Sequence, residues 1–242
     1  GHLDPIRPDT DDMGAYLRWY LNDVDNKDPY VRHAKAAYEL VKGLPHRPGD
    51  RRHAVTLHHA RQIRSWYEGF SLPFLETLTY RDARAAENLR WWEQSRNDKI
   101  VYWAASPHTS NNPNQQITVP PGPDWTFPSA GSYLRRWYGE QYLSIGYTFD
   151  HGTIHGDSGE TITMPPPARD WFEAQFSTTP ADQFTLDLRS PAPPPVREWL
   201  DAPAATRGLP DMGSESQISG GSLSQWFDVI IHRDVVTPAH PV

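Results

Sequence analysis

The sequence of 242 residues contains no cysteine. This absence excludes a disulfide-rich secreted scaffold, a thiolate nucleophile, an iron–sulfur cluster and a zinc site built on cysteine pairs. It is compatible with the reducing cytosol, and we expect a cytoplasmic protein. The chain also lacks a run of 18 apolar residues, and its first residues lack the basic and apolar regions of a signal peptide. We therefore expect no membrane association.

The chain also lacks a large excess of charge of either sign. The chain has 23 Lys and Arg against 30 Asp and Glu, a formal charge of -7, and no basic tract. Such a chain is poorly suited to neutralising a phosphate backbone, so nucleic acid is not an expected partner. A chain of this length can bury a sizeable core without disulfides or metal. We expect a small-molecule substrate and no cofactor.

The first part of the chain carries a helical pattern. Apolar residues recur at intervals of three and four from Met13, from Val31 and from Val55, which predicts three amphipathic helices. Asp11 or Asp12 can cap the first of them. Residues 80–94 contain neither Gly nor Pro and predict a fourth helix. Residues 10–95 are therefore expected to be a helical segment.

One face of the fourth predicted helix is unusual. Arg81, Ala85, Asn88 and Trp92 share it, so a guanidinium and an amide lie beside apolar residues. A buried, unpaired charge would cost several kcal/mol, so Arg81 and Asn88 need polar partners. The pattern fits a face that lines a polar cleft, and it fits equally well a structural Arg81 that is paired within the core.

A strand followed by a polar loop comes next. The β-branched and aromatic run Lys99–Ala105 predicts a strand, and it breaks into a loop that contains Ser106 and His108. A helix between the cap Ser129 and Gly139 and a second strand over 142–149 complete a βαβ unit, whose crossover should be right-handed. Ligands bind at the carboxyl ends of parallel strands, so His108 lies where chemistry is expected.

The last ninety residues are expected to finish the sheet. Residues 183–189 alternate between apolar and polar side chains as a half-buried strand does, and 226–232 is the expected neighbour. Residues 168–176 predict a short helix, and 208–221 a loop. His151 and His155 lie in a segment of loop-like composition without an identifiable third ligand, so no metal site is assigned.

Together these patterns predict a single α/β domain. A largely parallel central sheet, flanked by helices, is expected from residues 96–242, and the helical segment 10–95 precedes it. Composition does not shift enough along the chain to indicate an independent second domain.

Several segments occur in an order that identifies a family. These are Tyr80-Arg81-Asp82, then Val101-Tyr102-Trp103-Ala104 before His108, then Gly131-Ser132-Tyr133-Leu134-Arg135 and Ser144-Ile145-Gly146-Tyr147-Thr148-Phe149. In this order they resemble the C-terminal half of the erythromycin esterase family, over about residues 80–242. The resemblance implies an α/β fold with a central sheet. It also implies hydrolysis of a macrolactone ester by histidine and glutamate, without a nucleophilic serine.

The sequence departs from that family in two places. Where the family has His-Asn-x-His, this chain reads Ala105-Ser106-Pro107-His108, so only the second imidazole is kept. The family's Gly-Glu-x-x-His motif, which carries the presumed general base, does not occur. A base must lie within hydrogen-bond reach of the water that it activates. The chain is therefore expected to be the C-terminal portion of a longer one, with the N-terminal half of the same protein as a partner.

The leading hypothesis is a bacterial hydrolase of the erythromycin esterase type, of the kind that confers macrolide antibiotic resistance, acting on a bulky apolar ester or lactone. His108 and Arg81 are its predicted catalytic residues, and Asn88, Ser106 and His151 are predicted to bind the substrate. Ala105 and the missing motif motivate the alternative, a degenerate member that binds small molecules or acts as a tailoring enzyme in natural-product metabolism. No Gly-x-Ser-x-Gly elbow occurs, which argues against a serine hydrolase.

Overall fold

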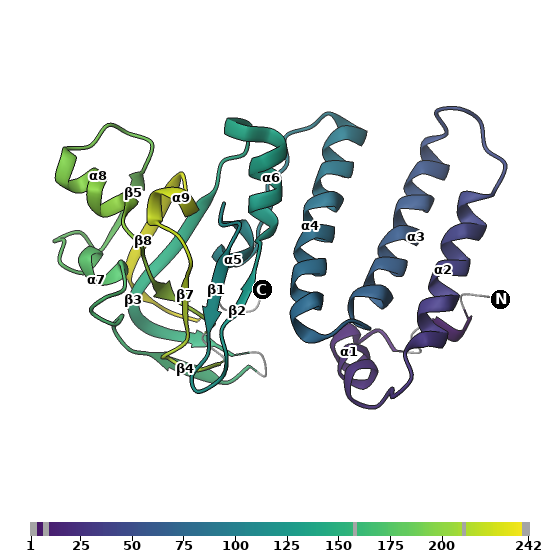
Figure 1. Ribbon diagram of the computed structural model, residues 1–242, viewed down its shortest axis with the longest axis horizontal. Coiled ribbons are helices and arrows are strands. Elements are labelled where there is room, and N and C mark those ends of the chain that lie inside the picture. Colours follow the sequence, from purple (N-terminus) through teal and green to yellow (C-terminus); the bar gives the residue numbers. More distant parts are fainter. Residues whose placement is uncertain (1–3, 7–9, 157–158, 210–211, 239–242) are drawn as a thin grey trace. The chain divides into compact units, whose positions relative to one another are not determined.

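The computed structural model describes residues 4–6, 10–156, 159–209 and 212–238. The chain forms two compact units, Gly1–Arg81 and Asp82–Val242, which are described one at a time (Figure 1). One helix, α4 (Phe74–Arg96), contributes residues to both units. The expectation of a single domain stays a prediction.

The first unit is helical, as the apolar periodicity predicts. After the 3-10 turn η1 (Asp4–Ile6), its helices are α1 (Met13–Asn22), α2 (Asp28–Lys42), α3 (Arg51–Gly69) and the start of α4. The carboxylate of Asp12 accepts a hydrogen bond from the N–H of Ala15 and so caps α1. Within the described ranges, no helix is long and apolar enough to span a membrane.

The core of the first unit is built from tyrosines. Tyr16, Tyr20 and Tyr67 are buried together with smaller apolar side chains. The hydroxyls of Tyr16 and Tyr67 lie 2.6 Å apart, and that of Tyr67 donates to the carbonyl of Ile6 at 2.7 Å. Burial strongly raises the pKa of Tyr67, so its hydroxyl stays protonated and keeps this donor role.

The second unit contains two four-stranded sheets, and neither is largely parallel. One sheet has the order β2-β1-β7-β6 and is antiparallel throughout. The other has the order β4-β3-β8-β5, and only its central pair, β3 and β8, is parallel. The strands are β1 (Gln115–Thr118), β2 (Trp125–Phe127), β3 (Ile145–His155), β4 (Thr161–Met164), β5 (Gln183–Asp187), β6 (Thr206–Arg207), β7 (Gln217–Ser219) and β8 (Val229–Val236). The prediction of a largely parallel central sheet is therefore wrong.

The prediction of a parallel sheet depended on the segment Lys99–Ala105, which was expected to be the first strand of a βαβ unit. Among the described residues it has no ladder partner and forms no strand. It keeps the alternation of a strand nevertheless. Tyr102 packs against the cluster around Leu134, while Val101 and Trp103 are 88% and 79% exposed. A β-branched, aromatic run is thus extended without being part of a sheet, because β pairing needs a neighbour that local sequence does not specify.

Some other sequence predictions for this unit are confirmed with shifted ends. The alternating run becomes β5 and pairs with β8, as expected, in antiparallel register. The loops expected over 208–221, around His151 and His155, and around Ser106 and His108 are wrong, since these segments contain β7, β3 and a short helix, respectively. The expected helix over 168–176 is shorter. The helices are α5 (Ser106–Thr109), α6 (Ala130–Tyr138), the 3-10 turn η2 (Gly139–Gln141), α7 (Glu173–Phe176), α8 (Pro194–Asp201) and α9 (Leu223–Trp226).

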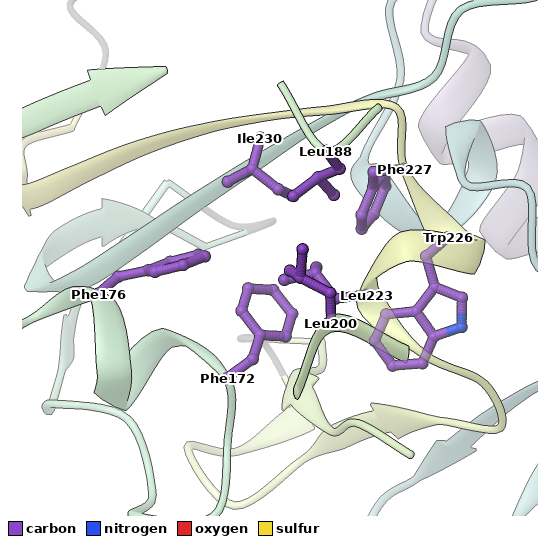
Figure 2. Packing of buried hydrophobic residues seen from close by; sticks show 8 residues of the cluster. All are labelled: Phe172, Phe176, Leu188, Leu200, Leu223, Trp226, Phe227 and Ile230. Atoms are coloured by element: carbon purple, nitrogen blue, oxygen red, sulfur yellow. The ribbon is translucent and has the colours of Figure 1, made fainter. Parts of the chain in front are cut away.

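The main core of the second unit lies against the parallel pair β3 and β8, which are neighbours in space although far apart in sequence (Figure 1). Figure 2 shows Ile230 of β8 beside Leu188, on the same side of the cluster as Phe227. The aromatic residues of this core include Phe172, Phe176 and Trp226, and Trp226 is 2% exposed. The indole nitrogen of Trp226 lies on the side turned away from the other labelled residues (Figure 2).

Ser129 caps α6 as predicted and does more than cap it. Its hydroxyl accepts a hydrogen bond from the N–H of Ser132 at 3.1 Å and donates to the carbonyl of Ser110 at 2.6 Å. The residue is fully buried.

Ser129→Ala should therefore lower the free energy of unfolding by about 1–2 kcal/mol. Ser222→Ala removes the weaker cap of α9, with a hydrogen bond of 3.3 Å, and should cost less in the same denaturant titration. Equal losses would contradict this ranking.

Candidate functional site

His108 is held by a buried carboxylate. It lies on α5, and its Nδ1 is 3.0 Å from both carboxylate oxygens of Asp82 on α4. Asp82 is 2% exposed and also accepts a hydrogen bond of 2.9 Å from the N–H of Ala130, the first residue of α6. Three segments of the second unit therefore fix one imidazole.

This arrangement suits proton transfer. An ionised carboxylate can only accept hydrogen bonds, so the Nδ1 of His108 carries the proton and Nε2 is left as the basic nitrogen. The same carboxylate stabilises the imidazolium that forms when Nε2 takes a proton. The His108 side chain is 26% exposed, so water or a ligand can reach it.

A cavity of about 870 Å³ lies next to this pair. Pro107 and Ser110, on either side of His108 in the chain, line it, whereas His108 is not among the lining residues. Most of its wall is apolar and aromatic, with contributions from Trp103, Phe149 and Phe184. This volume is in the range of small-molecule sites.

The polar part of the cavity wall contains a buried acid and a buried base. Glu173 on α7 is 2% exposed, and its Oε1 accepts hydrogen bonds from the hydroxyl of Thr206 and from the N–H of Arg207 at 3.3 Å. Burial raises the pKa of Glu173. The guanidinium of Arg207 lies over the ring of Phe149 at 4.7 Å, and burial lowers its pKa. Both shifts have the sign expected where water is removed from a charged group.

His232 on β8 is the second imidazole of this region. It has no exposed surface, and its Nδ1 lies 2.8 Å from the hydroxyl of Thr148 on β3. Its Nε2 is 3.4 Å from a carboxylate oxygen of Asp234. Burial lowers the pKa of His232, which favours the neutral imidazole.

Among the residues predicted from sequence, Ser106 and His108 lie together on α5. Ser106 lines the cavity, and its hydroxyl is engaged with the backbone of Tyr147, 3.1 Å from the N–H and 3.4 Å from the carbonyl. A hydroxyl held in this way is a substrate contact at most.

The other predicted residues lie elsewhere. Arg81 is exposed on α4 and is the last residue of the first unit, while Asn88 is half-buried further along the same helix. His151 is exposed on β3, and its Nδ1 is paired with Asp150 at 2.7 Å. None of these three residues lines the cavity. Their assignment to a site stays a prediction.

Sequence reasoning missed Asp82, Glu173, Arg207 and His232. Asp82 lies between Arg81 and Arg84 in a polar turn of helix, so the local sequence does not mark it as a buried residue. The other three come from short elements whose partners are distant in sequence, so no spacing could have grouped them. Across the described ranges, no three His, Asp or Glu side chains are grouped so as to hold a metal ion.

A family model described as erythromycin esterase matches residues 2–236. The match therefore includes the N-terminal helices, beyond the stretch from residue 80 that the motifs indicate. No curated protein matches the chain.

Solved structures match the fold at low sequence identity. A protein from Bacillus cereus is 22% identical, with a TM-score of 0.73 over 99% of this chain and 59% of its own. A succinoglycan biosynthesis protein is 19% identical, with a TM-score of 0.73 over 99% of this chain and 57% of its own. A mutant of the erythromycin esterase EreC in its open conformation is 16% identical, with a TM-score of 0.58 over 92% of this chain and 56% of its own. The chain thus spans less than three fifths of these relatives.

Proposed function

The chain belongs to the erythromycin esterase family, and on that premise we propose that it hydrolyses a carboxylic ester or lactone of a bulky, largely apolar molecule. The observation that carries the proposal is the contact between His108 and the buried Asp82 beside an aromatic-lined cavity. Family membership suggests an esterase-like hydrolase, and the pair supplies the base that such a reaction needs.

In the proposed reaction, the Nε2 of His108 takes a proton from a water molecule, whose oxygen attacks the ester carbonyl carbon. The tetrahedral intermediate then breaks its bond to the alcohol oxygen, and the imidazolium of His108 returns the proton to that oxygen. The products are the carboxylic acid and the alcohol, and water is the only co-reactant. Asp82 orients the imidazole and balances its charge in both steps.

The test is turnover of a panel of macrolides and simple aryl esters by the purified protein. Asp82→Asn should lower kcat at least tenfold and leave KM within about threefold, because an amide keeps the shape but no longer selects the Nδ1–H tautomer. Asp124→Asn is the matched control, since Asp124 is exposed and pairs with Gln116 and Thr118. Equal kcat in Asp82→Asn and the wild-type protein would remove this pair from the mechanism.

A second candidate function is binding without hydrolysis. It is favoured by Ala105, which stands where the family has its first histidine and which lines the cavity. In this case macrolides or aryl esters should bind stoichiometrically in calorimetry and be recovered intact after incubation. Release of acid that depends on His108 would favour the hydrolase instead.

A further inference from the structure

Buried polar atoms without a partner gather on the cavity. In the described part of the chain, six buried side-chain nitrogen and oxygen atoms without a hydrogen-bond partner in the protein belong to four residues that line this one cavity. A fifth lining residue, His232, has its Nε2 3.4 Å from a carboxylate oxygen of Asp234, outside hydrogen-bond geometry. The five residues come from the strands β1, β6 and β8 and from the helices α7 and α9. They are Gln115, Glu173, Arg207, Trp226 and His232. Each is at least nine-tenths buried.

This concentration needs a physical reason. An unpaired buried polar group costs about 1–3 kcal/mol, and folded proteins contain few of them. Gln115 is the clearest case, because both its amide nitrogen and its amide oxygen lack a partner while the side chain is 1% exposed. Leucine would fill a similar volume there without that cost. Polar side chains kept unpaired beside a cavity are typical of a ligand-binding wall.

The unpaired atoms include both hydrogen-bond donors and hydrogen-bond acceptors. Arg207 offers Nε and Nη1, and Trp226 offers Nε1, all of them donors. Gln115 offers one donor and one acceptor, and Glu173 offers Oε2. A hydroxyl group accepts and donates at the same time, so it satisfies such a mixture better than a carboxylate, which only accepts, or an ammonium, which only donates.

The charges around Arg207 also disfavour an anion. The Nη2 of Arg207 already donates to the carbonyls of Asp150 and Pro165, at 2.8 and 2.9 Å, so its two terminal nitrogens cannot both grip one carboxylate. The carboxylates of Glu173 and Asp150 lie in its electrostatic surroundings. Burial raises the pKa of Glu173.

We propose that this wall, formed by Gln115, Glu173 and Arg207 with Trp226 and His232, is a subsite for a neutral ligand that carries hydroxyl groups on an apolar body. The ligand's body lies against the aromatic side chains, and its hydroxyls pair with the wall after changes of side-chain rotamer. The proposal rests on the proposed function in that it defines the substrate class of the same cavity. Its test uses a molecule without an ester, so that binding and hydrolysis can fail separately.

The experiment compares three probes with the same eight-carbon tail and different head groups: octyl glucoside, octanoate and octylamine. Each is titrated into the purified protein by calorimetry, below its micelle-forming concentration. Octyl glucoside should bind with the highest affinity of the three. Tighter binding of octanoate or of octylamine, or no binding of octyl glucoside, would overturn the proposal.

Gln115→Leu gives the decisive variant. It should weaken octyl glucoside about tenfold, by removing hydrogen bonds to the ligand, while the melting temperature stays the same or rises because two unpaired buried atoms are removed. Gln116→Leu is the matched control on the same strand, since Gln116 pairs with Asp124 and does not line the cavity. It should leave the affinity unchanged. A lower melting temperature with unchanged affinity in Gln115→Leu would show a structural role and refute the subsite.

Discussion

Replacing His108 with alanine should lower kcat for any ester that the protein hydrolyses by about 10²–10⁴-fold, the range expected for loss of a general base. Alanine cannot take the proton of the attacking water or return it to the leaving alcohol. The loss should appear in kcat, with little change in KM, because the proton transfers by His108 occur in the transition states and not in substrate binding. Steady-state kinetics on an aryl ester measure both constants.

His155→Ala is the control for this experiment, since His155 is an exposed histidine at the end of β3. It should hydrolyse the ester at the wild-type rate. The melting temperature of His108→Ala should be recorded as well, because the change leaves the buried Asp82 with the N–H of Ala130 but without the imidazole. Full activity in a folded His108→Ala protein would rule out the proposed mechanism.

Gly131→Ala should lower the free energy of unfolding by about 3 kcal/mol. A Cβ at this position in α6 would lie 2.2 Å from the carbonyl oxygen of Ser110 and 2.4 Å from that of Thr109. Both are backbone atoms at the end of α5, so a side-chain rotation cannot relieve the clash. In a domain of this size the loss corresponds to a drop in melting temperature of about 6–12 °C.

Gly139→Ala, at the other end of α6, separates this clash from the general cost of losing glycine. Gly139 has a positive φ of 55°, and a Cβ there would meet no atom within 4 Å. Its replacement should cost about 1 kcal/mol, from backbone strain alone. If both alanine variants melt at the same temperature, close packing of α6 on α5 is not what fixes Gly131. Because α5 carries His108, Gly131→Ala should also reduce turnover in the fraction that is folded.

Local signals in the sequence were enough to predict α1, α2, α3, α4 and α6, but not the short helices α5, α8 and α9. In α6, a hydroxyl residue at the start and a glycine at the end mark the boundaries correctly, because a cap acts within one turn. The alternation in β5 was predicted equally well, since Phe184 and Leu186 pack against the core cluster while the residues between them are exposed. These predictions depend on neighbours that lie close in sequence or on simple burial.

Strand pairing could not be predicted in the same way. The strands β1, β2 and β7 have three or four residues each, and the loop-like composition around them carries no signal for register. The opposite error occurred at Lys99–Ala105, where strand-forming residues have no ladder partner among the described residues. Whether such a segment becomes a strand depends on a partner strand, whose distance along the chain is not fixed by the local sequence.

The candidate site was predictable only in its central residue. His108 was identified by its place after an aromatic run, but its partner Asp82 is 26 positions earlier on a helix. The sequence pattern indicated Arg81, whereas the carboxylate of the neighbouring Asp82 is the group that contacts α5 and α6. Contacts of this kind are created by tertiary packing, and the sequence alone contains no spacing that identifies them.

The position of β8 in its sheet has a consequence for synthesis on the ribosome. β3 and β5 are both hydrogen-bonded to β8, so the two strands stay unjoined until Val229–Val236 has been translated. At about 5–20 residues per second, the roughly eighty residues between the partners β3 and β8 take several seconds to appear. During this interval Phe172 and Phe176 lack the β8 residue Ile230, which belongs to their core cluster in the folded chain.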